Sequence, residues 1–373
     1  MQSTSVEKEK INTKGTQKQD VYDMIVFCHL RWDFVYQRPQ HVISRMAKNY
    51  KILFVEEPWH RPEEQGSRLN KISDMLHVLQ PNTTNIDGIG AIIKEYADVN
   101  SDMIGWFYSP SFVPLLSHFN FSTIIYDCMD ELSLFKGAPA ELIDHEQYLI
   151  ANADIVFTGG KSLYESKARL HDNVHCFPSS VDRAHFAKAL NGIAVPEDIA
   201  SVKSPIVGYC GVIDERINME LLNEAAGRMP EVAFVMIGPL AKIGEHDLPR
   251  RENIHYLGMK DYIELPAYIK AFKLAMMPFA LNDATKYISP TKTLEYMAAH
   301  KPIISTAITD VVRDYAHCVS IVHNADDFEN AVTAALGIEA NVMMNGDYER
   351  ILDQTSWDNT VAKMQSHIKA IAE

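Results

Sequence analysis

One segment late in the chain joins a lysine and a glutamate at a helical spacing that suits chemistry with a nucleotide. It spans residues 289–302, where Pro290 stands at a helix start and Lys292 and Glu295 follow one turn apart. Free N–H groups and the positive end of a helix attract phosphate, and Lys292 adds a full charge. The Glu295 carboxylate can accept two vicinal ribose hydroxyls. The spacing therefore suits a nucleoside diphosphate, but it equally suits a surface helix with Ser289 as N-cap and a Lys–Glu pair.

Two acids in the first half of the chain stand where a catalytic base is often placed. Asp127 and Asp130 follow the apolar run 124–126, which has the composition of a buried strand. In doubly wound folds, functional residues gather at the carboxyl ends of strands. Either aspartate could deprotonate a hydroxyl as a general base, and either could instead cap the next helix or hold a loop.

Aromatic side chains lie between the first candidate strand and the first candidate helix. The segment 29–41 contains Trp32 and Tyr36, whose flat rings suit stacking on a sugar, followed by Gln37 and Arg38. The alternative for the two aromatics is packing between the sheet and the helix.

The bulk composition excludes several classes of protein. The net charge of −14 opposes general binding of nucleic acid, because contacts with phosphates need a basic surface. The five cysteines are odd in number and form no Cys-x-x-Cys pair, so we expect neither a disulfide framework nor a zinc site. No apolar run approaches the ~20 residues of a membrane span, and residues 1–20 lack the apolar core of a signal peptide. We therefore expect a cytoplasmic protein.

Short apolar runs alternate with longer helical patterns from Tyr22 onward, which predicts an α/β fold with parallel sheets. The length of 373 residues exceeds what one core usually organises. Residues 195–205 carry two prolines and several polar residues, as a connection between domains does. We predict a disordered tail over 1–21, a first domain over 22–195, a second domain over 204–356 and a final helix over 357–373.

Two common nucleotide fingerprints are missing or incomplete. No candidate strand is followed by Gly-x-Gly-x-x-Gly, so a dinucleotide site lacks its main support. The run Thr-Gly-Gly-Lys-Ser at 158–162 ends like a phosphate-binding P-loop, but Ile155 stands where that loop needs a glycine. We interpret Gly159 and Gly160 as residues that let the chain turn from a strand into a helix.

The donor-site motif of the family 4 glycosyltransferases is similar to the run at 290–302, Pro-x-Lys-x-x-Glu-Tyr-Met-Ala-x-x-Lys-Pro. Further runs that resemble the family follow in its order at 208–216, 237–239 and 253–260. The run Gln-Arg-Pro-Gln-His at 37–41 resembles a subset of bacterial polysaccharide glycosyltransferases. This resemblance implies the GT-B fold, in which two Rossmann-like, doubly wound domains face each other across a cleft.

The resemblance also implies roles for individual residues. Glu295 would bind the ribose of a nucleoside diphosphate sugar, and the loop before it would approach the pyrophosphate. The residues expected at the donor nucleotide and diphosphate are Arg216, Lys260, Ser289, Pro290, Thr291, Lys292 and Glu295. The expected catalytic residues are Asp130 and Asp127. The residues expected at the acceptor or the cleft are Trp32, Gln37, Arg38 and Tyr287, the last standing where the family usually has a second glutamate.

Together these features predict a metal-independent hexosyltransferase that moves a sugar from a UDP- or GDP-linked donor to a glycan or lipid-linked acceptor in surface polysaccharide synthesis. We expect no cofactor or metal, because no Asp-x-Asp follows a strand and basic groups can neutralise the leaving diphosphate. Two alternatives remain open. One is a sugar-nucleotide epimerase of the same fold, and the other is a non-catalytic sugar-binding subunit of a polysaccharide assembly complex.

A basic face on the first candidate helix suggests contact with a membrane surface. Arg38, Arg45, Lys48 and Lys51 follow one another without an acid between them. Such a face could touch anionic lipid headgroups at the inner side of the cell membrane. The alternative is an ordinary solvated face.

Overall fold

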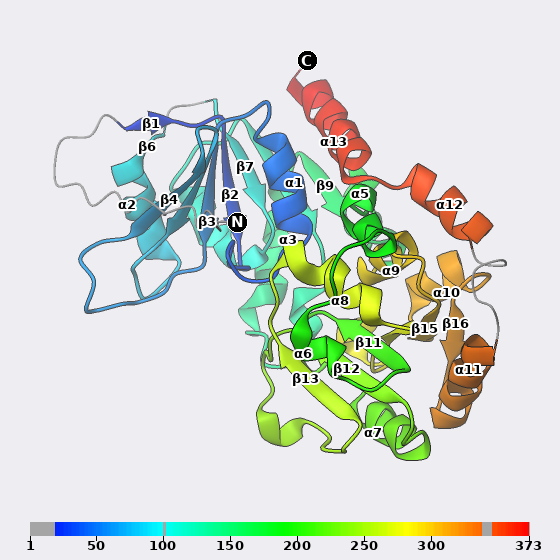
Figure 1. Ribbon diagram of the computed structural model, residues 1–373. Helices are drawn as coiled ribbons and strands as arrows, with labels where there is room; N and C mark the ends of the chain where they lie inside the picture. Colours follow the sequence, from blue (N-terminus) through cyan, green and yellow to red (C-terminus); the bar gives the residue numbers. More distant parts are fainter. Residues whose placement is uncertain (1–18, 100–101, 338–344, 373) are drawn as a thin grey trace.

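The chain folds into two α/β domains that lie against each other, as the ribbon of the computed structural model shows (Figure 1). The structure describes residues 19–99, 102–337 and 345–372. Of the tail predicted over 1–21, only the last three residues fall within these ranges. Two of them form the strand β1 (Asp20–Val21), which pairs with β6 (Ala97–Asp98), so the end of the predicted tail belongs to a strand. Residues 1–18 of that tail lie outside the described residues.

The first domain is built on one large sheet. Within the described residues its strand order is β10-β9-β8-β7-β2-β3-β5-β4, and all neighbours are parallel except β4 and β5. The strands are β2 (Met24–Cys28), β3 (Ile52–Glu56), β4 (Arg68–Ser73), β5 (Leu76–Gln80), β7 (Ile104–Phe107), β8 (Thr123–Cys128), β9 (Ile155–Thr158) and β10 (Val174–Cys176).

The central strand β2 explains why the sequence shows continuous apolar runs. Successive side chains of a strand point to opposite faces of the sheet. Ile25 and Phe27 enter the apolar core on one face, where Phe27 stacks on Phe107 at 4.8 Å. Met24 and Val26 enter a second core on the other face. Because both faces are covered, every position of the strand is apolar.

Helices and 3-10 turns connect the strands of the first domain. They are α1 (Arg38–Met46), α2 (Asp87–Tyr96), η1 (Pro110–Ser117), η2 (Leu132–Leu134), α3 (Glu141–Asn152) and α4 (Lys161–Lys167).

The second domain has a parallel sheet of the doubly wound type. Its strand order is β13-β12-β11-β14-β15-β16. The strands are β11 (Ile206–Cys210), β12 (Ala233–Ile237), β13 (Ile254–Gly258), β14 (Leu274–Met277), β15 (Ile303–Thr306) and β16 (Ser320–Val322). The order reverses direction between β11 and β14, and doubly wound sheets bind ligands in the crevice outside the carboxyl ends of strands at such a point.

The helices that follow lie mostly on the second domain. They are α5 (Arg183–Phe186), η3 (Ala187–Leu190), α6 (Glu197–Ala200), α7 (Met219–Arg228), η4 (Glu245–Asp247), η5 (Tyr262–Glu264), α8 (Leu265–Ala271), η6 (Asp283–Thr285), α9 (Lys292–Ala298), α10 (Thr309–Tyr315), α11 (Ala325–Gly337), α12 (Asn345–Gln354) and α13 (Trp357–Ala372).

The boundary between the domains lies earlier than the predicted 195–204. Val181, Phe186 and Ala189 are buried in the apolar core of the second domain. The supposed linker itself contains α6, and Ile199 from that helix is buried in the same core. The prolines at 196 and 205 suggested a linker between domains, but the apolar residues Val195, Ile199 and Val202 pack against the core of the second domain.

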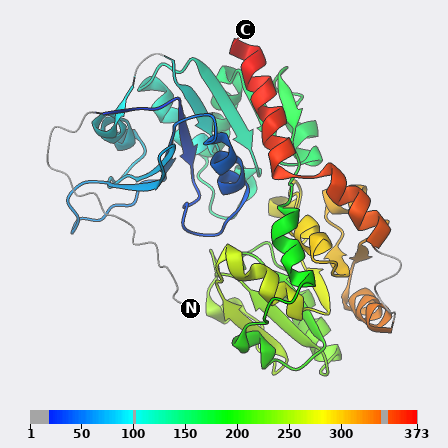
Figure 2. The ribbon, with the colours of Figure 1, turned by 45° about the horizontal axis from the view of Figure 1, so that its top comes forward.

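The last helix returns to the first domain. In Figure 2, α13, in red, lies alongside the first domain, whereas α12 lies on the second. The buried Trp357 ring stacks on His41 of α1 at 4.8 Å, and Met364 joins the apolar core that contains β2. The helix therefore ties the two domains together.

A buried aspartate of the second domain contacts the first domain. Asp310 of α10 accepts a hydrogen bond from the backbone N–H of Ser162 in α4 at 3.2 Å. A Cβ on Gly160 would lie 2.7 Å from the Asp310 carboxylate. The backbone of Gly160 is extended, with φ of −167°. This glycine therefore permits a close contact between domains, and it is not needed to make the predicted turn from strand to helix.

Candidate active site

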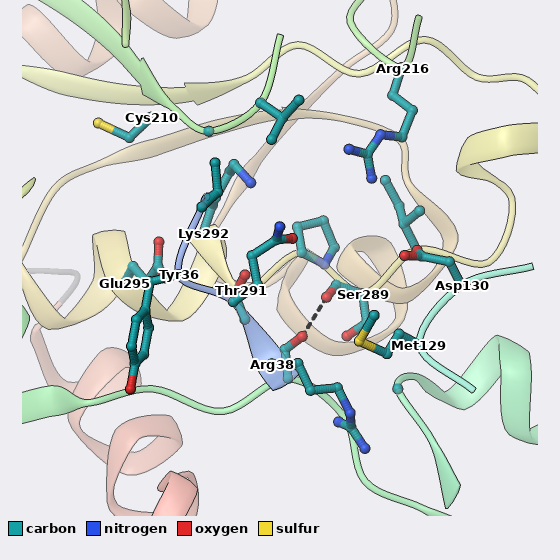
Figure 3. Close-up of a pocket in the computed structure, with 18 of the residues that line it drawn as sticks. Tyr36, Arg38, Met129, Asp130, Cys210, Arg216, Ser289, Thr291, Lys292 and Glu295 are labelled. Carbon is teal, nitrogen blue, oxygen red and sulfur yellow. Dashed lines mark hydrogen bonds between the residues drawn. The ribbon is translucent and has the colours of Figure 1, made fainter. Parts of the chain in front are cut away.

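A cleft between the domains opens at the carboxyl ends of β11 and β14. It encloses roughly 1000 Å³, counted out to its open mouth. Residues of both domains form its walls and converge on its interior (Figure 3). The predicted site residues that line it are Gln37, Arg38, Asp130, Arg216, Ser289, Pro290, Thr291, Lys292 and Glu295.

Helix α9 positions the two charged residues of the sequence motif. Its residues at 293, 294, 296 and 297 are buried, so the positions 292 and 295 remain for the cleft. The hydroxyl of Tyr296 accepts a hydrogen bond from the backbone N–H of Cys210 at 2.8 Å. This bond fixes the helix to the end of β11, where the sheet reverses its order.

Gly211 makes room for the lysine. Its φ of 152° lies in the region that favours glycine. A Cβ at this position would stand only 2.0 Å from Cε of Lys292. The absence of a side chain therefore lets the Lys292 stem pass across the end of β11, and its ammonium lies 5.6 Å from the centre of the Tyr209 ring.

Lys292 and Glu295 lie in the cleft, and apart from the contact of Lys292 with the Tyr209 ring their charged ends have no partner among the described residues. No hydrogen bond or ion pair of either side chain is present among the described residues, so the pair expected of a surface helix does not form. Burial lowers the pKa of Lys292, and it raises the pKa of Glu295 to about 7 against the opposing effect of the lysine. Charges that are half-buried and have no hydrogen-bond or ion-pair partner raise the free energy of the folded protein, unless a bound ligand supplies that partner.

Asp130 brings a third charged group into the cleft, from the first domain. Its side chain forms no hydrogen bond or ion pair within the described ranges. Burial raises its pKa, and the positive charges of Arg216 and Lys292 oppose that effect. A carboxylate of the first domain thus faces the cations of the second across the cleft.

Asp127 has to be removed from the predicted catalytic residues. Its side chain is completely buried and forms an ion pair with Arg38 at 2.8 Å. Burial raises the pKa of Asp127, which the neighbouring guanidinium opposes. Asp127 lies within β8, which ends at Cys128, and its side chain is buried in the domain, whereas Asp130 lies beyond the strand and reaches the cleft.

Arg38 lines the cleft, but its guanidinium is already engaged. Besides Asp127, it donates to the carbonyl oxygen of Phe177 at 2.6 Å. The side chain is almost wholly buried. We conclude that Arg38 holds α1 against β8 and leaves little hydrogen-bonding capacity for a phosphate. Gln37 lies at the start of the same helix and lines the cleft.

Trp32 and Lys260 lie outside the cleft, contrary to expectation. The ring of Trp32 is buried and packs edge-on against Phe54 at 5.0 Å, so it has no free face for a sugar. The ammonium of Lys260 pairs with Asp198 of α6 at 2.7 Å. That lysine therefore fastens the connecting segment to the second domain.

Tyr287 also lies outside the cleft. Its ring packs against the apolar core of the first domain and lies 5.1 Å from the ammonium of Lys286. It lines a separate hollow between α4 and α10, with Ser162 and Arg313. The position where a second glutamate was expected therefore serves the contact between domains.

Arg216 lines the cleft with part of its guanidinium occupied. Nε and Nη2 bind the carboxylate of Asp214, the latter at 2.7 Å. Nearby, the hydroxyl of Ser179 donates to the carbonyl oxygen of Ser289 at 2.6 Å, the dashed line in Figure 3. This bond holds the loop before α9 to the first domain.

Sequence reasoning missed part of the cleft wall. Tyr36 of the first domain stacks on Tyr262 of the second at 4.6 Å, and Tyr262 stacks in turn on His185 at 4.3 Å. The sequence left Tyr36 open between stacking on a sugar and packing within the protein, and its ring stacks on a protein ring. The short η5 turn that carries Tyr262 gave no signal in the sequence.

The basic face of α1 is largely neutralised by the returning helix. Arg45 and Lys48 both pair with Asp358 of α13, each at 3.3 Å, and Lys51 pairs with Asp20 at 2.6 Å. These side chains therefore give no support to a contact with lipid. None of the helices in the described ranges has the length and apolar character that a membrane crossing requires.

No group of three or more His, Cys, Asp or Glu side chains is placed to hold a metal ion in the part of the chain that the structure describes.

Comparison with known families and proteins supports the predicted relationship. Residues 204–337 match the family described as Glycosyl transferases group 1. The putative teichuronic acid biosynthesis glycosyltransferase TuaH of Bacillus subtilis (strain 168) is 26% identical over 218 residues. That match covers 54% of each protein, so the chain spans about half the length of this curated relative in the alignment.

Solved structures of similar fold cover almost the whole chain. Sucrose-phosphate synthase from Thermosynechococcus elongatus has a TM-score of 0.69 at 15% identity, over 94% of this chain and 99% of that one. The Anabaena protein Alr3699/HepE, in complex with UDP and glucose, has a TM-score of 0.64 at 12% identity, over 92% and 99%. The predicted two-domain fold is thereby confirmed. The chain has the GT-B fold, and its second domain carries the sequence pattern of the glycosyl transferases group 1.

Proposed function

We propose that this protein is a glycosyltransferase that moves a hexose from a nucleoside diphosphate sugar to a glycan or lipid-linked acceptor in surface polysaccharide synthesis. The observation that carries the proposal is the pair Lys292 and Glu295, whose charged ends reach the cleft unpaired among the described residues. A diphosphate would form charge-assisted hydrogen bonds with the ammonium of Lys292, and ribose hydroxyls would donate hydrogen bonds to the carboxylate of Glu295. The relative TuaH, named for teichuronic acid biosynthesis, supports a polysaccharide as the product class.

The proposed reaction needs stabilisation of a leaving diphosphate. As the bond between the sugar carbon and the diphosphate oxygen breaks, negative charge grows on that oxygen. Lys292 and Arg216 line the cleft and would stabilise this charge from fixed positions, so we propose that the reaction proceeds without a metal ion. In an inverting reaction, Asp130 would accept the proton of the attacking hydroxyl, and the raised pKa of its carboxyl favours that role.

The proposal places the enzyme in the cytoplasm. All five cysteines are free thiols in the structure. Free thiols persist in a reducing compartment.

A screen of nucleotide sugars by thermal shift tests the donor assignment. A ligand at 100 times its dissociation constant should stabilise the native protein by about 2.7 kcal/mol. Glu295→Ala should abolish the shift, whereas Glu252→Ala, at an exposed position of the same domain, should retain it. Absence of any shift with UDP- and GDP-linked sugars, or an equal shift in both variants, would contradict the proposal.

Product analysis separates transfer from the other activities. The wild-type protein should release nucleoside diphosphate faster when an acceptor glycan is added, with a new glycosidic product. A change of the sugar without an acceptor would instead identify an epimerase. Binding of the donor without turnover across a broad acceptor panel would identify a non-catalytic subunit.

A further inference from the structure

The loop after β8 reaches from the first domain to the second. It begins at Asp130 in the cleft, passes through η2 and turns at Gly137, whose φ of 76° favours glycine. The η2 turn contacts η6 of the second domain. The loop thus connects a free carboxylate of the cleft with a contact between the domains.

Phe135 on this loop lies against two cations of the second domain. The guanidinium carbon of Arg216 is 5.5 Å from the ring centre, and the ammonium of Lys242 is 4.5 Å from it. Both distances lie within the range of ~6 Å in which the negative face of an aromatic ring attracts a cation. One aromatic ring of the first domain therefore orders two positive charges of the other domain.

Both cations keep N–H groups that their protein partners leave without a hydrogen bond. Asp214 accepts hydrogen bonds from Nε and Nη2 of Arg216. Nη1 of the same guanidinium has no hydrogen-bond partner in the described part of the chain and is available to a ligand. Lys242 is about half exposed and contacts Glu215 at 3.4 Å. The φ of Lys242 is 60°, an unfavourable conformation for a residue with a side chain, and such conformations often occur at functional sites.

Ion pairs within the first domain hold the start of this loop in place. The ammonium of Lys167, which is only 2% exposed, binds Glu131 and Glu146, each at 2.8 Å. The hydroxyl of Tyr126 donates to Glu146 at 2.6 Å. This buried network holds the residue next to Asp130, so the loop presents Phe135 in a defined position.

We infer that Phe135 is a positioning residue for the donor diphosphate: its ring, held on the first domain, fixes Arg216 in the cleft wall and Lys242 against the same ring. Arg216 lines the cleft directly. The positive charge of Lys242 also acts on Asp130 in the cleft, because it opposes the rise in the pKa of that carboxyl that burial causes. Binding of the diphosphate is then coupled to the contact between the two domains. The inference rests on the proposed function, because it requires a nucleoside diphosphate in the cleft.

Paired ligands that differ only by the diphosphate test this role. Isothermal titration would compare UDP with uridine, and GDP with guanosine, on the wild-type protein, Phe135→Ala, Phe135→Tyr and the control Tyr148→Ala. Tyr148 is an exposed aromatic residue of α3 outside the cleft. Phe135→Ala should weaken the diphosphate by about 10-fold and leave the nucleoside within about 2-fold, since only the two cation–π contacts are lost. Phe135→Tyr keeps the ring face and should restore the affinity.

Each other outcome is decisive. Equal losses for the diphosphate and the nucleoside would overturn the inference, because they would indicate a general disturbance of the fold. Unchanged affinity in Phe135→Ala, beside a wild-type protein that binds UDP or GDP, would overturn the inference alone. A wild-type protein that binds neither would overturn the proposed function, and the inference with it.

Discussion

The ionisation of Glu295 should control donor binding near neutral pH. Burial raises the pKa of its carboxyl to about 7, although the neighbouring Lys292 favours the charged form. An ionised carboxylate can accept hydrogen bonds from two vicinal hydroxyls, whereas the protonated acid must donate one proton itself. The donor should therefore bind the ionised form of the protein.

The size of the effect follows from the titration. With a pKa of about 7, the ionised fraction rises from roughly 0.1 at pH 6 to roughly 0.9 at pH 8. If only the ionised form binds, the apparent affinity scales with this fraction and should rise about 10-fold between these pH values.

Isothermal titration with a nucleotide sugar at pH 6, 7 and 8 measures this rise. Glu295→Gln is the matched variant, because it keeps the shape and removes the titration. Its affinity should be weaker at pH 8 and nearly independent of pH. The reasoning would be refuted by a flat profile in the wild-type protein, or by the same slope in Glu295→Gln.

The same titration predicts the stability of the ligand-free protein. The pKa of Glu295 is raised above its ordinary value of 4.5 in the folded state. Its contribution to stability is therefore full below about pH 4.5 and is lost as the pH rises through 7. Glu295→Gln does not ionise, so at pH 8 it should be more stable than the wild type, on the order of 1–3 kcal/mol. Urea unfolding at pH 5 and pH 8 checks this, and equal differences at both values would contradict it.

Three further substitutions test other parts of the structure. Lys292→Gln should weaken UDP by roughly 10- to 100-fold while uridine binding changes little, and equal losses in titrations of both ligands would argue against a diphosphate contact. Arg38→Ala leaves Asp127 as an unpaired buried charge and should lower the free energy of unfolding by about 3–5 kcal/mol, whereas a loss below ~1 kcal/mol in urea unfolding would show that the pair is dispensable. Trp357→Ala should cost about 3–5 kcal/mol by opening a cavity under α13, measured against the surface control Tyr148→Ala, and similar unfolding midpoints for the two would refute that packing.

Local patterns predicted the parts of the fold that depend on neighbouring residues. The alternation of short apolar runs with helical patterns predicted parallel sheets, and the structure places an apolar core on each side of the parallel strand β2. The spacing of Lys292 and Glu295 predicted that both would lie on one side of a helix, because a helical turn fixes that relation. Their common placement in the cleft follows from the buried positions between and beside them.

Long-range contacts decided what spacing could not. Asp127 and Asp130 are three residues apart and were equal candidates, but Asp127 pairs with Arg38, which is 89 residues away in sequence. Phe135 meets Arg216 only because the two domains close on each other. Neither partner is visible in the local sequence.

The sequence by itself therefore determined the α/β class, the two domains and the lysine and glutamate of α9, since these follow from periodicity within one element. The tertiary structure decided which acids are free, where the domains divide and that Tyr287 lies outside the cleft. The physical reason is that burial and pairing of a charge depend on groups brought together from distant parts of the chain, and their free energies depend on that packing.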